Sequence, residues 1–105
     1  MRARWYITED KLEKITADKG SFIICGGADP RWESEGWYKE DGTKTIVTPF
    51  AHKFRMLDDD GIVYYVGYCE DGDSEEAFNP LDDYGMPNDG CTEIQYWENG
   101  KWETL

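Results

Sequence analysis

The stretch that decides the fold is residues 92–105, Thr92-Glu93-Ile94-Gln95-Tyr96-Trp97-Glu98-Asn99-Gly100-Lys101-Trp102-Glu103-Thr104-Leu105. Asn-Gly is the dipeptide that a two-residue type I′ hairpin turn favours, because both turn positions need a positive φ. With this dipeptide in the turn, Trp97 faces Trp102 across the two strands. Such a cross-strand aromatic pair stabilises a hairpin by roughly 0.2–1 kcal/mol. The stretch therefore predicts two antiparallel strands.

Strand alternation assigns the side chains of this hairpin to two faces. The face expected to meet the core carries Ile94, Tyr96 and Leu105, with Glu98, Lys101 and Glu103. The other face carries Trp97 and Trp102, with Glu93, Gln95 and Thr104. Two alternatives stay open for the tryptophans. Either another segment such as the loop around Trp32 covers them, as is usual for large aromatic residues, or they are exposed and form a binding hot spot.

Turn signals upstream predict further strands. Strand-like residues at 53–57 and 62–68 flank Asp58-Asp59-Asp60-Gly61, in which Asp-Gly suits a type I′ turn. Asp41-Gly42 is a similar signal between residues 37–38 and 45–48. Residues 21–25 are typical of a short buried strand closed by Gly26-Gly27, and residues 2–7 are β-like.

Helix signals occur near the start of the chain. Thr8 is suited to an N-cap, acidic residues follow it, and Lys19 precedes Gly20, which predicts a helix from Glu9 to about Lys19. Residues 28–36 are expected to form a loop, and the polar, turn-rich stretch 70–90 a long one. Together these elements predict the α+β class: an antiparallel, meandering β-sheet built from hairpins, with one short N-terminal helix.

Composition limits the classes to which the chain can belong. At 105 residues it has the length of one domain, 1–105, and its 15% of aromatic residues is unlike a disordered chain. No apolar run is long enough to cross a membrane, and no apolar signal region follows the first arginines. The three cysteines form no C-x-x-C pair. We therefore expect a cytoplasmic protein with free thiols and no cofactor.

Catalytic and metal-binding patterns are weak. His52 is the only histidine, and no nucleophile motif surrounds it. Residues 71–76, Asp71-Gly72-Asp73-Ser74-Glu75-Glu76, begin like a calcium loop, but Glu76 occupies the position where that loop needs glycine. The sequence therefore predicts no catalytic residue and no metal site, and we expect a binding protein rather than an enzyme.

Charge is distributed unevenly along the chain. Residues 1–55 hold 9 acidic and 10 basic residues, a net charge of +1, whereas residues 56–105 hold 14 acidic residues and only Lys101, a net charge of −13. The two halves give the total of −12. Nucleic acid and anionic membranes are poor partners for the second half, whereas a basic protein surface suits it.

The density of carboxylates invites a comparison with DNA. A domain of this length spans on the order of 30–35 Å, and duplex DNA of that length carries roughly 18–20 phosphates. The 13 carboxylates between Met56 and Gly100 are of the same order. If they share a face, that surface approximates a short piece of DNA backbone. The alternative is an ordinary solvated acidic surface, although solubility alone does not require such segregation.

Three motifs carry a resemblance to a known group of proteins. They are residues 54–61 (Phe-Arg-Met-Leu-Asp-Asp-Asp-Gly), 78–85 (Phe-Asn-Pro-Leu-Asp-Asp-Tyr-Gly) and 90–94 (Gly-Cys-Thr-Glu-Ile). Over about half of its length the chain resembles short proteins of phages and conjugative elements of gut Firmicutes. In size and charge it also resembles the anti-CRISPR and anti-restriction inhibitors that mimic DNA. This resemblance implies an inhibitor of host defence, although whole-surface DNA mimics are acidic throughout and residues 1–55 are nearly neutral.

These observations lead to one functional hypothesis and one alternative. The hypothesis is a mobile-element inhibitor whose acidic surface binds a basic, nucleic-acid-binding host protein, without contacting nucleic acid or membrane itself. Its predicted partner-binding residues are Asp58, Asp59, Asp60, Glu70, Asp71, Asp73, Glu75, Glu76, Asp82 and Asp83, with Trp97 and Trp102 adding apolar contact. The alternative is a housekeeping protein–protein interaction module that uses an exposed tryptophan patch, with acidity serving only solubility.

Overall fold

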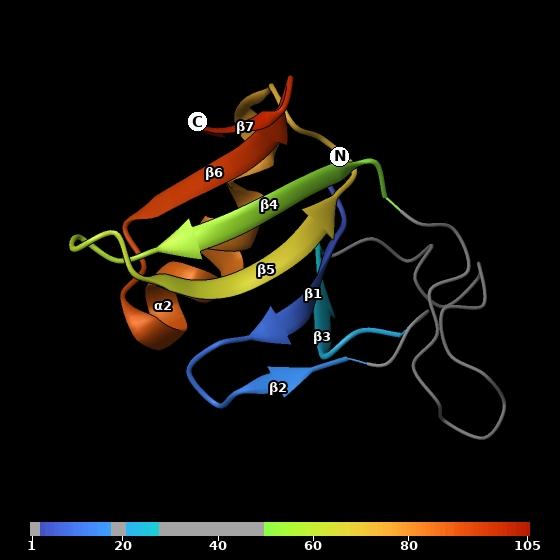
Figure 1. Cartoon of the computed structure of the whole chain (residues 1–105). Coiled ribbons are helices and arrows are strands. Elements are labelled where there is room, and N and C mark those ends of the chain that lie inside the picture. Colours follow the sequence, from blue (N-terminus) through green and yellow to red (C-terminus); the bar gives the residue numbers. More distant parts are fainter. Residues whose placement is uncertain (1–2, 18–20, 28–49) are drawn as a thin grey trace, which may run out of the picture.

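The structure is a computed structural model and describes residues 3–17, 21–27 and 50–105. This part forms an antiparallel sheet in the order β2-β1-β5-β4-β6-β7, with β3 also paired to β1 (Figure 1). The strands are β1 Trp5–Asp10, β2 Ile15–Thr16, β3 Ile24–Gly26, β4 His52–Leu57, β5 Val63–Cys69, β6 Glu93–Glu98 and β7 Lys101–Thr104. The helical segments are η1 Glu75–Phe78, η2 Leu81–Gly85 and α2 Met86–Asp89. The broad α+β class is thus confirmed, but the helix is not N-terminal.

The C-terminal hairpin, β6–β7, has the predicted register. Trp97 is opposite Trp102 and Glu98 is opposite Lys101. Asn99 has a φ of 52° and Gly100 a φ of 81°, so both turn residues are in the left-handed region that a type I′ turn requires. The local sequence therefore sets both the turn and the pairing of these strands.

The β4–β5 hairpin is confirmed, but its turn differs from the predicted one. Gly61 has a φ of 78°, whereas Asp60 is not among the residues with positive φ, so the turn is not type I′. The Asp58 carboxylate explains the difference, because it accepts hydrogen bonds from the backbone N–H groups of Asp60 and Ile62, each at 2.9 Å. Aspartate commonly stabilises turns in this way.

The predicted helix from Glu9 to about Lys19 is wrong over the residues that the structure describes. Glu9 and Asp10 end β1, and after a turn the chain returns as β2, antiparallel to β1. The Asp10 carboxylate accepts the N–H groups of Leu12 at 2.9 Å and Glu13 at 3.0 Å, which closes the turn. Lys14 then has a φ of 57°, a conformation incompatible with an α-helix.

Residues 70–90, predicted to be a long loop, instead supply the helical segments, so this prediction is also wrong. Ser74 accepts a hydrogen bond from the Glu76 N–H at the start of η1. Ala77 and Leu81 are buried, four positions apart, which is the spacing of one helical face. Gly90, with a φ of 71°, ends α2 as a left-handed cap.

The helical segments cover one face of the sheet and lie behind it in Figure 1. Phe54 and Met56 of β4, with Ile94 and Tyr96 of β6, are almost completely buried in the same cluster as Leu81 and Ala77. The Tyr96 hydroxyl donates a hydrogen bond of 2.7 Å to the Ala77 carbonyl, which ties η1 to the sheet. This contact satisfies a polar group that burial would otherwise leave unpaired.

A smaller cluster lies where β1 and β5 meet. Tyr6 stacks between Phe22 and Phe50, with ring centroids 6.0 Å and 5.1 Å away, and Tyr68 packs beside it. The predicted strand at 21–25 is present in part, as β3. The predicted loop at 28–36 and the hairpin around Asp41-Gly42 lie outside the described residues. In the described part of the chain, no helix combines the length and apolar character needed to cross a membrane.

Candidate functional site

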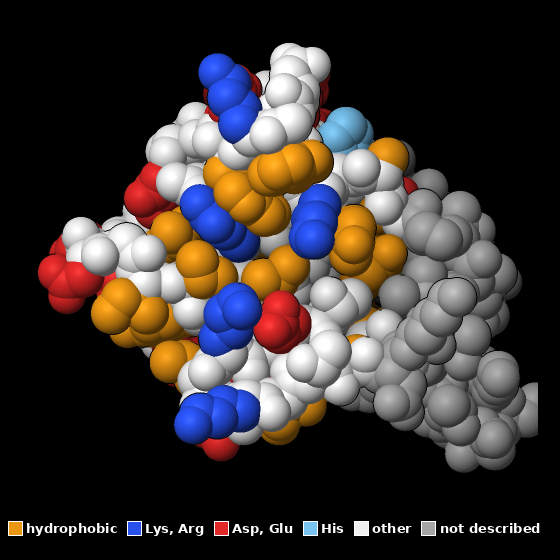
Figure 2. All heavy atoms as spheres, in the orientation of Figure 1, with side chains coloured by type: hydrophobic (Ala, Val, Ile, Leu, Met, Phe, Trp, Pro, Cys, Tyr) orange, Lys and Arg blue, Asp and Glu red, His pale blue; other side chains and the backbone are white. Residues whose placement is uncertain are grey.

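The sheet has a covered face and an open face. The covered face carries the helical segments, and we call the opposite one the open face. In β4, Phe54 and Met56 are buried against the helical segments, so the alternating residues Lys53 and Arg55 lie on the open face. Figure 2 shows this face, where Lys and Arg side chains lie among hydrophobic ones, with Asp and Glu side chains mainly at the left edge and one near the centre. An acidic chain thus has a basic and aromatic sheet surface.

Arg55 is held in place by two neighbours on the open face. Its Nε donates a 2.7 Å hydrogen bond to Gln95 Oε1, and its guanidinium carbon lies 4.5 Å from the centroid of the Trp102 ring. A cation above an indole at this distance is attracted by the negative face of the ring. The register explains the first contact, because Arg55 and Gln95 are directly paired across β4 and β6.

Trp97 and Trp102 form the tryptophan pair that the hairpin register predicted. Their ring centroids are 5.3 Å apart and their planes meet at 71°, an edge-to-face arrangement that aromatic rings favour. The side of Trp97 away from this contact is open, since the residue is 48% exposed, whereas Trp102 is half-buried. Trp97 is thus exposed, whereas the loop around Trp32 invoked by the other alternative lies outside the described residues.

A polar network lies beside the tryptophan pair. Gln95 Nε2 donates to Glu93 at 2.7 Å and contacts Thr104 Oγ1 at 3.3 Å, and the Thr104 hydroxyl also donates to the Glu93 carboxylate. These bonds from Thr104 and Gln95 lower the pKa of Glu93. The network fixes the Gln95 amide and, through it, Arg55. Sequence reasoning placed these residues on one face but did not identify Lys53, Arg55 or Gln95 as functional candidates.

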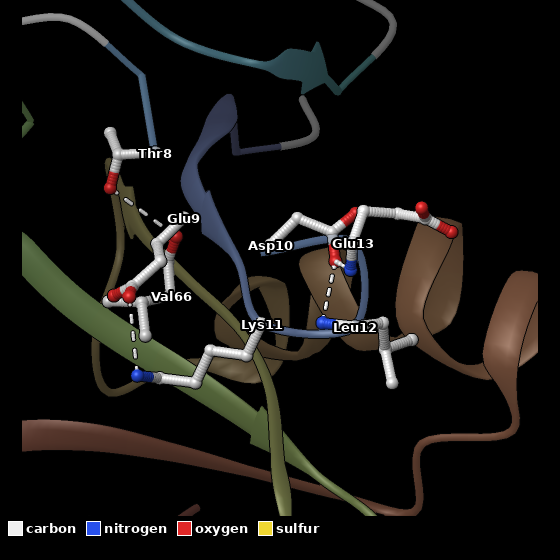
Figure 3. A network of polar contacts seen from close by, with 7 residues as sticks. All are labelled: Thr8, Glu9, Asp10, Lys11, Leu12, Glu13 and Val66. Carbon is white, nitrogen blue, oxygen red and sulfur yellow. Dashed lines mark hydrogen bonds and ion pairs between the residues drawn. The ribbon is translucent and has the colours of Figure 1, made fainter. Parts of the chain in front are cut away.

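The basic side chains of the described residues differ in how they are paired. Lys11 Nζ lies 3.2 Å from the Glu9 carboxylate at the end of β1 (Figure 3). Lys101 lies 3.5 Å from Glu103, and buried Arg4 is paired with Glu70. Within the described residues, the Lys53 ammonium group makes neither an ion pair nor a hydrogen bond. On the open face, this side chain therefore makes no polar contact within the described part of the fold.

Four of the ten carboxylates predicted to bind a partner are engaged inside the molecule. Glu70 accepts the backbone N–H of Arg4 at 2.8 Å and its guanidinium at 2.6 Å. Asp83 accepts the Trp5 indole N–H at 3.1 Å, and Asp58 closes its turn. Hydrogen bonds from the hydroxyl and N–H of Ser74 and from the N–H of Asp73 lower the pKa of Asp71 to about 2. These contacts stabilise the fold.

The other predicted carboxylates lie in two places. Asp59 and Asp60 are exposed at the tip of the β4–β5 hairpin. On and before the helical segments lie Asp73, Glu75, Glu76 and Asp82, of which all but the half-buried Glu76 are exposed. We call residues 70–90, including exposed Asp83 and Asp89, the acidic side. This side includes no Lys or Arg in the sequence.

The predicted set therefore does not form one surface. The acidic side belongs to the segments that pack on the covered face, whereas Trp97 and Trp102 lie on the open face of the sheet. The expectation that these tryptophans add apolar contact beside the carboxylates of 70–90 is corrected by this arrangement. One flat partner surface cannot contact both.

A hollow of about 280 Å³ lies where the acidic side meets the C-terminal hairpin. Three carboxylates line it, from Asp73, Glu98 and Glu103, together with Gly72, Tyr96, Thr104 and Leu105. The hollow is open to solvent and large enough for one lysine or arginine side chain. Its lining favours a cationic group, because opposite charges attract more strongly where solvent is partly excluded.

Comparisons with known proteins identify no relative: no protein-family model, curated protein or solved structure matches this chain. Among the described residues, no three His, Cys, Asp or Glu side chains are grouped so that they could hold a metal ion. The geometry described above is therefore the basis on which a function can be proposed.

Proposed function

We propose that this chain is a small acidic binding protein whose acidic side docks on a basic, nucleic-acid-binding host protein. In this proposal it is a cytoplasmic inhibitor of the anti-CRISPR or anti-restriction type, carried by a mobile element. The observation that carries the proposal is the separation of charge in space. Carboxylates without lysine or arginine occupy residues 70–90, and the unpaired Lys53 lies on the opposite, open face.

Electrostatics supports such a role in two ways. A surface of one sign raises the association rate with an oppositely charged partner, and it disfavours partners of the same sign. The exposed carboxylates of the acidic side require no rearrangement of the fold to meet lysine or arginine side chains. The hollow lined by Asp73, Glu98 and Glu103 adds a recessed position for one such side chain.

The residues proposed to contact the partner are fewer than the sequence suggested. Glu70, Asp58 and Asp71 already accept hydrogen bonds within the fold. The proposed contact residues are the exposed carboxylates for which the fold shows no such contact. They are Asp59, Asp60, Asp73, Glu75 and Asp82.

Affinity capture from a host lysate at low and high salt, with bound proteins identified by mass spectrometry, tests this proposal. The expected result is one nucleic-acid-binding protein or complex that is lost at high salt, because salt screens exposed charges. The double variant Asp73→Lys/Asp82→Lys should lose it. The control Glu9→Lys/Glu13→Lys makes the same change in net charge at the β1–β2 turn, outside residues 70–90 and the hollow, and should retain it.

Two outcomes would contradict the proposal. Equal loss of binding in both double variants would mean that only total charge matters. A partner retained at high salt and lost in Trp97→Ala would move the contact to the open face. In that case the acidic side would serve solubility, as in the alternative hypothesis.

A further inference from the structure

A patch on the open face has the composition of a binding site for an anion beside an apolar group. It consists of Lys53, Arg55, Trp97 and Trp102, and we call it the donor patch. We propose that the donor patch docks a segment of a partner protein in which a carboxylate side chain stands next to an aromatic or aliphatic one. This surface is separate from the acidic side, and the inference does not depend on the function proposed for that side.

The hydrogen-bonding capacity of the patch is one-sided. Lysine, arginine and tryptophan side chains are donors only. Among the described residues, Arg55 Nε has an acceptor in Gln95, but the Lys53 ammonium, the two terminal nitrogens of Arg55 and both indole N–H groups have none. A partner that satisfies these groups must bring acceptors. A carboxylate meets this need best, because it accepts several hydrogen bonds and carries the opposite charge.

The patch is organised before any partner arrives. Arg55 is fixed by the Gln95 amide on one side and by the Trp102 ring on the other. The Glu93–Gln95–Thr104 network holds that amide in turn. A side chain that is already ordered loses little conformational entropy on binding, which favours affinity.

The apolar part of the patch is large and exposed. Trp97 is 48% exposed and packs edge-to-face on Trp102. Tryptophan and arginine are the residue types most enriched among interface residues that dominate binding energy. An aromatic or aliphatic side chain of the partner can pack on Trp97 while a neighbouring carboxylate meets Arg55 or Lys53.

Charge favours a protein segment over nucleic acid. The whole chain has a net charge of −12, and Glu93 and Glu9 lie on the same face as the patch. A single strand of nucleic acid carries a charge at every residue and would experience this repulsion along its length. One or two carboxylates respond mainly to charges within a Debye length of about 8 Å, and Lys53 and Arg55 belong to the patch itself. A second copy of this chain would bring its own −12 and is disfavoured for the same reason.

Nuclear magnetic resonance of the full ¹⁵N-labelled chain tests the inference, because each indole N–H gives its own signal. The probe is a capped peptide that alternates aspartate and phenylalanine. We expect it to shift the indole signals of Trp97 and Trp102, and a peptide with asparagine in place of aspartate to shift them far less. The variant Lys53→Gln/Arg55→Gln should weaken peptide binding about tenfold.

Matched controls separate the patch from general charge. Lys11→Gln/Lys14→Gln removes the same charge at the β1–β2 turn and should leave the dissociation constant within about twofold of the wild-type value. If the double patch variant fails to fold, Lys53→Gln alone removes an exposed side chain without a partner among the described residues, and should weaken binding about threefold.

Several results would overturn the inference. The indole signals could stay unchanged in the presence of peptide, or the turn variant could weaken binding as much as the patch variant. An oligothymidylate of about ten nucleotides that binds more tightly than the peptide would assign the patch to single-stranded nucleic acid. Indole shifts on simple dilution, without peptide, would assign it to a second copy of the chain.

Discussion

Replacing Glu70 with glutamine should destabilise the fold far more than removal of an exposed carboxylate. Glu70 follows β5 and binds Arg4 through two contacts, from the backbone N–H at 2.8 Å and from the guanidinium at 2.6 Å. The Arg4 side chain is only 7% exposed and that of Glu70 is 26% exposed. The substitution keeps the size of the side chain but removes the negative charge that faces the buried Arg4 guanidinium.

The expected magnitude follows from burial. Breaking a buried ion pair by removing one partner costs about 3–5 kcal/mol. We expect a smaller loss of unfolding free energy here, about 2–3 kcal/mol, for two reasons. Solvent reaches about a quarter of the Glu70 side chain, and glutamine keeps one hydrogen-bond acceptor. With the urea dependence usual for small domains, this loss lowers the midpoint of unfolding by roughly 1 M.

Urea denaturation followed by tryptophan fluorescence measures this difference. Glu75→Gln is the control, because it removes the same charge from an exposed side chain and should change stability by no more than about 0.5 kcal/mol. If the two variants unfold at the same urea concentration, the Arg4–Glu70 contact does not stabilise the fold, and Glu70 returns to the set of candidate partner contacts.

Three further predictions concern packing, pH and thiol chemistry. Gly67→Ala should destabilise the protein by about 3 kcal/mol in urea denaturation, because a Cβ there would lie 2.1 Å from the Tyr6 carbonyl oxygen. An unchanged free energy of unfolding would mean that β1 and β5 can move apart. The pKa of Asp71 is lowered to about 2 in the folded protein, so its contribution to stability is present above the unfolded pKa of about 3.9 and is lost as the pH falls towards 2. The difference in unfolding free energy between wild type and Asp71→Asn should therefore shrink over that pH range. A difference that stays constant would contradict this reasoning. Burial raises the pKa of Cys91 to about 11, so Ellman's reagent near neutral pH should modify this thiol only on unfolding; rapid modification of the native protein would show that the thiol is accessible.

The hairpins could be predicted because their signals are local. Asn99-Gly100 sets two positive φ angles and thereby the pairing of Trp97 with Trp102. The β4–β5 hairpin was also predicted, although its turn was assigned to the wrong type. The Asp58 side chain, which closes that turn, competes with the preference of the Asp-Gly dipeptide, and a rule that considers the dipeptide alone misses it.

The helix was misplaced because capping signals are ambiguous. An aspartate that accepts the N–H groups two and three positions ahead begins a helix, but it also closes a turn. Thr8 and the acidic residues after it indicate a helix start, whereas the Asp10 carboxylate closes a turn. Conversely, Pro80, Gly85 and Pro87 made residues 70–90 resemble a loop. The spacing of Ala77 and Leu81, after the capping residue Ser74, was the signal that could have identified the helical segments.

The candidate site could be predicted only in part, because its decisive contacts join distant residues. Charge counting found the acidic region but could not show that Glu70 is used by Arg4, which is 66 positions away. It also missed the donor patch. Lys53 and Arg55 alternate with Phe54 and Met56, but which pair faces solvent depends on where the helical segments pack, and those segments were not predicted.

The position of these segments also determines whether the two charged surfaces influence each other. Packed layers lie about 10 Å apart, and the Debye length at physiological ionic strength is about 8 Å. The carboxylates of residues 70–90 are therefore largely screened from Arg55 on the far side of the sheet. Because of this screening, an acidic segment can approach the donor patch even though the chain as a whole is strongly negative.

At low ionic strength the field of the acidic side reaches across the molecule, so binding at the donor patch should weaken while binding at the acidic side strengthens. Opposite responses to salt distinguish two independent surfaces from one continuous interface.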